Sequence, residues 1–251
     1  MTNTLKAPAK APKANAETDA ETPPPASPLL RFYRSSLGKK LITGATGLAL
    51  VAFVLAHMVG NLLLFIGSDA YNAYALLVSN FGVVYYAFEL ALTAIVVLHA
   101  WVGIEIFWRK RKARPVGYST YQSAGGPSYQ TLSSRTMIVT GSVLAVFLVF
   151  HLRTFRFGTY YITQLDGETV RDLARLVIED FHRLPYVVGY SVILLLLGSH
   201  LRHGLWSALQ SIGLLHRGIR PLAYGASGAI AGGIAIGFLL LPWAIYLGWV
   251  G

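Results

Sequence analysis

The chain alternates between long apolar stretches and shorter polar links. The apolar stretches lie at 41–66, 83–108, 136–157, 185–209 and 222–249. An α-helix rises about 1.5 Å per residue, so about 20 apolar residues cross the hydrocarbon core of a bilayer. The pattern predicts an all-α fold, a membrane bundle of five transmembrane helices.

The first 28 residues differ from the rest, because they are rich in Ala, Pro and Lys and almost lack large apolar side chains. Such a segment cannot bury enough surface to offset the entropy of ordering. We therefore expect a disordered tail at 1–28 and a transmembrane domain at 29–251. The tail has no apolar core of the kind a secretory signal peptide needs, so the first span is expected to direct insertion.

Charge gives the orientation. The chain is 54% hydrophobic and only 13% charged, with a net charge of +10. If the N-terminus is cytoplasmic, 16 of the 21 Lys and Arg residues lie on the cytoplasmic side. The positive-inside rule predicts that topology. The basic charge then faces anionic lipid or a cytoplasmic protein, and nucleic acid is not expected as a partner.

The link before the fourth span is long and lies on the predicted outer side. Residues 166–185 read DGETVRDLARLVIEDFHRLP, in which charged residues alternate with Val and Leu. This amphipathic pattern predicts a short helix on the outer face, with Pro185 opening the next span.

Each of the first four spans contains one histidine: His57, His99, His151 and His200. Each lies beyond the midpoint of its span by about three to five residues, or about 5–8 Å. Because successive spans run in opposite directions, His57 and His151 lie toward the outer face, and His99 and His200 toward the cytoplasm. Two imidazoles at one depth can ligate a six-coordinate b-type haem. The sequence has no cysteine, so thiolate ligands and covalent haem attachment are excluded.

Small residues follow three of these histidines: Gly60, Gly103 and Gly204. A residue without a Cβ lets a flat macrocycle approach the backbone. The alternative for the glycines and for any single histidine is helix packing or an interhelical hydrogen bond. Four histidines at matched, alternating depths favour two haems.

Several stretches resemble one family. They are SSLGKKLITGATGL before and within the first span, AHMVGNL, FELALTAIVVLHAWVGIEI, FHL, and GSHLRHGLWSALQSIG in the fourth span. Over about 30–250 the chain resembles the single-subunit, five-helix, diheme cytochrome b anchor of succinate:quinone oxidoreductases. The last motif favours His200 over His203 as the ligand.

The resemblance implies iron ligation by His57 with His151 in an outer haem b, and by His99 with His200 in an inner haem b. It implies an anchor and electron-transfer subunit of a succinate dehydrogenase or fumarate reductase, which does not itself act on the dicarboxylate. Flavoprotein and iron–sulfur subunits are the expected cytoplasmic partners, and a quinone, expected to be menaquinone, the membrane partner. The implied location is the cytoplasmic membrane of a prokaryote, within a respiratory complex that can form a higher oligomer.

Other polar residues have two interpretations each. Glu89 is a candidate for quinone protonation or a structural carboxylate. Arg202, His203 and Arg153 are candidates for binding haem propionates, or basic residues that extend to the interface. Glu105 is expected to pair with Arg109 four residues later.

Two other functions remain open on the residues alone. One is a different diheme membrane cytochrome b, although quinol-oxidising cytochromes place two ligands on one helix and no span here has two deep histidines. The other is a transport or assembly subunit in which the histidines serve packing.

Overall fold

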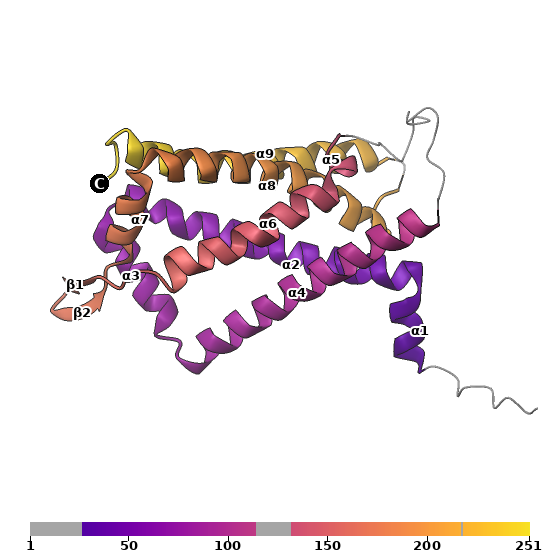
Figure 1. Cartoon of the computed structure of the whole chain (residues 1–251), viewed down its shortest axis with the longest axis horizontal. Coiled ribbons are helices and arrows are strands. Elements are labelled where there is room, and N and C mark those ends of the chain that lie inside the picture. Colours follow the sequence, from indigo (N-terminus) through magenta and orange to yellow (C-terminus); the bar gives the residue numbers. More distant parts are fainter. Residues whose placement is uncertain (1–26, 114–131, 217) are drawn as a thin grey trace, which may run out of the picture.

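A computed structural model describes residues 27–113, 132–216 and 218–251 (Figure 1). The predicted tail at 1–28 lies outside the described residues except for its last two positions. There Ser27 caps helix α1, Pro28–Arg34, by accepting the Leu30 N–H at 3.3 Å. The membrane domain predicted from residue 29 therefore begins with a short helix before the first span.

Five helices in the described part of the chain are long and apolar enough to cross a membrane. Their bounds are α2 (Ser36–Leu62, extended by the 3₁₀ turn η1, Leu63–Phe65), α4 (Val83–Lys112), α6 (Met137–His151, extended by the π-helical turn η3, Leu152–Arg156), α8 (Leu184–Ser211) and α9 (Arg220–Tyr246). The prediction of an all-α bundle of five spans is confirmed. The predicted opening of the fourth span at Pro185 is also confirmed, because this proline lies in the first turn of α8.

Four of the spans form a ring and the fifth lies outside it. Helix α2 packs against α4 and α8, and α6 packs against α8 and over a shorter stretch against α4. Helices α2 and α6 are therefore diagonally opposite, as are α4 and α8. Helix α9 runs along α8 (Figure 1), where a Cβ at Gly198 would lie 3.0 Å from the Ala235 methyl. This close contact between small residues brings α8 and α9 together.

The two ends of the bundle differ (Figure 1). One end, here called the basic end, carries α1, the C-terminus of α4 and the short helix α5, Leu132–Arg135. The opposite end, the cap end, carries α3 (Ser68–Ser79), a hairpin of β1 (Ile162–Leu165) and β2 (Glu168–Arg171), and α7 (Leu173–Phe181). The basic end is the predicted cytoplasmic side, and this orientation stays a prediction.

The link at 166–185 contains the expected short helix, α7, at Leu173–Phe181. The hairpin before it, whose second strand is Glu168–Arg171, was not predicted from the sequence. Asp166 and Gly167 both have positive φ, which the two-residue turn of a hairpin requires and which Asp-Gly sequences favour. The side chain of Asp172 then caps α7 by accepting the Arg175 N–H at 3.0 Å.

The largest cluster of buried apolar side chains joins the cap to the bundle. It includes Ala174, Val177 and Phe181 of α7, together with Tyr190 of α8 and Ile245 of α9. Burial of this apolar face holds α7 on the end of the spans. The cap is therefore packed onto the bundle over the ends of α8 and α9.

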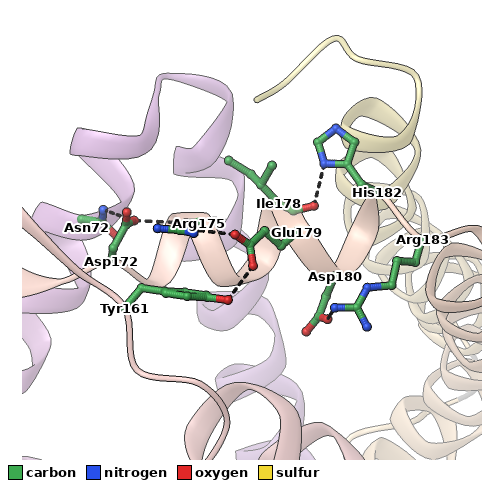
Figure 2. A network of polar contacts seen from close by, with 9 residues as sticks. All are labelled: Asn72, Tyr161, Asp172, Arg175, Ile178, Glu179, Asp180, His182 and Arg183. Atoms are coloured by element: carbon green, nitrogen blue, oxygen red, sulfur yellow. Dashed lines mark hydrogen bonds and ion pairs between the residues drawn. The ribbon is translucent and has the colours of Figure 1, made fainter.

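Asn72 links α3 to the start of α7. Its amide nitrogen donates to Asp172 Oδ1 at 2.9 Å (Figure 2). Its amide oxygen accepts the Ala174 N–H at 3.0 Å. We predict that Asn72→Ala lowers the free energy of unfolding by about 1–3 kcal/mol, because the buried Ala174 N–H loses its partner and Asp172 Oδ1 keeps only the Arg175 N–H. Thermal unfolding in detergent measures this. The exposed Asn80→Ala at the end of α3 is the control, and equal stability of both variants would contradict the prediction.

A second polar network in the cap joins Tyr161 and Arg175 to the carboxylate of Glu179 (Figure 2). Hydrogen bonds from Arg175 at 2.8 Å and Tyr161 at 2.7 Å lower the pKa of the Glu179 carboxyl below its ordinary 4.5. A carboxyl whose pKa is lower in the folded state stabilises the fold at pH values above its unfolded-state pKa. This stabilisation is lost as the pH falls through the folded-state pKa. We therefore expect the protection of the amides in β1 and α7, measured relative to the intrinsic exchange rate at each pH, to fall below about pH 4.5 in the wild type. Glu179→Gln should show lower protection already at neutral pH and a weaker pH dependence; identical protection profiles would contradict this.

Candidate functional site

The structure brings the four histidines of the spans together in two pairs. His57 of α2 and His151 of α6 have ring centroids 5.9 Å apart, with planes at 89°. His99 of α4 and His200 of α8 have ring centroids 6.5 Å apart, with planes at 69°. Each pair joins diagonally opposite helices, so both pairs lie across the middle of the ring. We call them the cap-side pair and the basic-side pair.

The separations within the pairs fit a metal between the rings. A transition metal lies about 2 Å from each imidazole nitrogen that binds it, and each nitrogen lies about 1 Å from the centre of its ring. The centroids of two imidazoles that share a metal are therefore about 6 Å apart. Both pairs match that separation. Within the described residues no three His, Asp or Glu side chains gather as a metal site, so a metal between either pair would have two protein ligands. Two imidazoles are the protein ligands that a six-coordinate b-type haem would need.

The basic-side pair is held by hydroxyl groups from neighbouring helices. Thr46 Oγ1 of α2 lies 3.1 Å from His99 Nδ1, and Thr140 Oγ1 of α6 lies 3.0 Å from His200 Nδ1. In both rings Nδ1 has a partner, which leaves Nε2 for a ligand. A hydrogen bond to the non-ligating nitrogen is the usual support of a metal-binding histidine.

The cap-side pair has different partners. His151 Nδ1 lies 3.1 Å from the phenol of Tyr190, a buried residue of α8. The Asn61 amide donates to the His57 carbonyl at 2.7 Å and also lies 3.4 Å from His57 Nε2. The shorter Asn61 contact is to the backbone, so this amide holds the His57 ring only weakly and leaves it free to bind a ligand.

Aromatic rings enclose the cap-side pair. Phe53 stacks on His57 with centroids 5.5 Å apart and planes at 16°. Phe147 and Phe155 lie 5.6 and 5.3 Å from the His151 ring. The π-helical turn that starts directly after His151 contains Phe155, and such turns are common at functional sites.

The glycines following the histidines divide into two kinds. A Cβ at Gly103 or Gly204 would meet nothing within 4 Å, and each glycine lies one turn after a histidine of the basic-side pair. A Cβ at Gly60 would lie 2.6 Å from the Tyr74 ring. Gly60 therefore makes room for Tyr74 of α3, which differs from the expectation that it makes room for a macrocycle.

Glu89 takes part in an ion pair between α4 and the end of α6. Arg156 donates through Nε at 2.7 Å and through Nη2 at 3.2 Å, and Tyr85 donates at 2.6 Å. The bidentate contact is the strong form of a carboxylate–arginine pair. Glu89 thus has a structural role, and quinone protonation by it stays a prediction.

None of the hydrogen bonds described for the three candidate propionate partners is to a histidine of either pair. Arg202 donates to the Tyr224 hydroxyl of α9 at 2.7 Å, which turns it toward the fifth span. His203 is partly buried and Arg153 is exposed. Their roles stay predictions.

Sequence reasoning missed a charged network at the basic end. Glu105 pairs with Arg109 at 3.4 Å, as predicted, but also forms an ion pair with Lys39, whose side chain is only 1% exposed. Tyr33 donates to Glu105 at 2.9 Å, and the Lys39 ammonium lies 4.5 Å from the centre of the Tyr33 ring. The two adjacent lysines of SSLGKK gave no sign that one is buried.

Comparison with protein-family models, curated proteins and solved structures finds no match to this chain. The function is therefore inferred from the residues and their geometry, above all from the two pairs of imidazoles.

Proposed function

We propose that the chain is the membrane-anchor and electron-transfer subunit of a succinate:quinone oxidoreductase, carrying two b haems with bis-histidine ligation. The observation that supports this most is the presence of two imidazole pairs on diagonally opposite helices, each at the separation expected for rings that share a metal. Packing alone does not require that all four histidines meet in such pairs.

In this proposal His57 and His151 hold the outer haem, and His99 and His200 hold the inner haem. A bound haem supplies one-electron transfer by changing the oxidation state of its iron. The protein residues provide neutral imidazole ligands, fix their orientation through Thr46, Thr140 and Tyr190, and exclude water with aromatic rings. Glu89 is the proposed proton-exchanging group for quinone on the cap side, and it must first leave Arg156.

The resemblance of the sequence motifs supports the remaining part of the proposal. Flavoprotein and iron–sulfur subunits dock at the basic end, which faces the cytoplasm of a prokaryote, and electrons pass between them and membrane menaquinone. Arg202, His203 and Arg153 are proposed to contact haem propionates. The dicarboxylate reaction, succinate oxidation or fumarate reduction, takes place on the flavoprotein.

Purification of the full chain from its native membrane tests the proposal. We expect flavin and iron–sulfur to co-purify, and succinate or a quinol to reduce both haems. Two haems without co-purifying flavin would favour a different diheme cytochrome. A chain without haem would favour a packing or transport subunit. Either result would overturn the proposal.

A further inference from the structure

Spans α2 and α6 contain the same spaced set of residues, Thr-Gly-x5-Phe-x3-His. In α2 these are Thr46, Gly47, Phe53 and His57, and in α6 they are Thr140, Gly141, Phe147 and His151. Threonine and histidine are eleven residues apart, or about three helical turns, so they share one face of the helix. Their separation along the axis is about 16 Å.

The corresponding residues of the two helices make the same contacts. In each helix the phenylalanine packs against the histidine of its own span, with centroids 5.5 Å apart in α2 and 5.6 Å in α6. In each helix the threonine contacts the histidine of the next span, His99 or His200. Helices α2 and α6 thus each provide one imidazole of the cap-side pair and one hydroxyl that contacts the basic-side pair.

The hydroxyl of Thr46 donates its single proton to a backbone carbonyl of its own helix. Thr46 Oγ1 lies 2.7 Å from the Ile42 carbonyl oxygen, a distance that requires a proton between the two oxygens. Toward His99 Nδ1 at 3.1 Å the hydroxyl can then only accept, so Nδ1 carries the ring proton. The lone pair of the neutral ring is therefore on Nε2.

The same reasoning applies to the second copy. Thr140 Oγ1 contacts the carbonyl oxygens of Thr136 at 3.1 Å and Met137 at 3.2 Å, and these oxygens accept only. Thr140 donates to them and accepts from His200 Nδ1 at 3.0 Å. Both rings of the basic-side pair consequently have the Nδ1–H form.

The glycine of each copy sets the position of the ring. A Cβ at Gly47 would lie 3.1 Å from His99 Cε1, and a Cβ at Gly141 would lie 3.3 Å from His200 Cε1. Both contacts are closer than ordinary van der Waals contact, so a side chain there would push the ring away from the threonine.

We infer that the repeated Thr-Gly pair is a positioning device, which fixes the tautomer and location of His99 and His200 so that both Nε2 lone pairs are directed to one metal. This inference rests on the proposed function, because the metal it serves is the iron of the inner haem. Thr46 and Thr140 are positioning residues, since they act only through the imidazoles. The device is restricted to the basic-side pair, because the partners of the cap-side histidines are an amide and a phenol.

The inference is tested with Thr46→Val and Thr140→Val in the full haem-loaded chain. A hydrogen bond accepted from Nδ1–H makes the imidazole a stronger donor, which favours ferric iron. Each variant is expected to raise the midpoint potential of the inner haem and to lower its affinity about 10-fold or more, the usual effect of losing such a support. The potential of the outer haem should not change.

Two control variants separate positioning from fold stability. Thr46→Ser keeps the hydroxyl and should restore the wild-type potential. Thr43→Val removes a hydroxyl one turn earlier whose oxygen has no hydrogen-bond partner among the described residues, and it should leave both haems unchanged. Unchanged inner-haem potentials in both Thr46→Val and Thr140→Val would overturn the inference, as would an equal shift in Thr43→Val. A wild-type chain with no haem would instead overturn the proposed function.

Discussion

Replacing His57 with alanine is expected to remove the outer haem and to leave the inner haem in place. The His57 and His151 rings are 5.9 Å apart, while His99 and His200 form a separate pair with its own threonine partners. A haem with one axial histidine missing loses six-coordinate ligation and much of its affinity. The haem content of the purified full chain, measured as pyridine haemochrome, should fall from two to one per chain.

Three further variants complete this experiment. His151→Ala should remove the same haem as His57→Ala, and His99→Ala should remove the other one. The haem that remains in His99→Ala should have a different midpoint potential from the haem that remains in His57→Ala. His182→Ala is the control, because this exposed imidazole of the cap lies outside the spans that carry both histidine pairs and hydrogen-bonds to the carbonyl of Ile178, and its loss should leave both haems. Retention of two haems in both His57→Ala and His99→Ala would contradict the assignment of ligands.

Replacing Gly204 with leucine is expected to exclude the inner haem without preventing the fold. Gly204 is one turn after His200 on the same face of α8, and a Cβ there would meet no atom of the protein within 4 Å. If a macrocycle fills that space, the leucine side chain occupies its place, and overpacking prevents binding. We expect most of the inner haem to be lost, so that the haem content falls from two to about one per chain.

The matched control is Gly189→Leu, on the same helix near the cap end. Its Cβ would also meet nothing within 4 Å, but the residue is exposed. This variant should keep both haems and a normal melting temperature. Equal haem content in the two leucine variants would contradict the placement of a macrocycle beside Gly204.

The spans and the pairing of histidines could be predicted from the sequence because both follow from simple geometry. An apolar stretch of sufficient length has few alternatives to a transmembrane helix. The alternation of direction then places His57 at the depth of His151 and His99 at the depth of His200, without knowledge of any side-chain contact. Their function as iron ligands stays a prediction.

The cap was predicted less well because its signals are local and short. The amphipathic pattern correctly indicated α7, but it extended across Asp166 and Gly167, a dipeptide that favours a hairpin turn. Helix α3 was not predicted. Its attachment to α7 depends on Asn72, whose bonding to Asp172 joins segments that are 100 residues apart.

The surroundings of the histidines contain one signal that could have been found. The repeated Thr-Gly-x5-Phe-x3-His pattern is visible in the sequence, and an eleven-residue spacing indicates a shared helix face. By contrast, the burial of Lys39 against Glu105 cannot be inferred from spacing, because a basic residue before a span usually extends to the interface. The role of Gly60 depends on Tyr74, a residue of the unpredicted helix α3.

The most direct test of two bis-histidine haems is the electron paramagnetic resonance spectrum of the oxidised, purified full chain. We expect two low-spin ferric signals in equal amount, one lost in His57→Ala and the other in His99→Ala. A high-spin signal, a single low-spin signal, or the absence of haem iron from the wild-type chain would contradict this assignment.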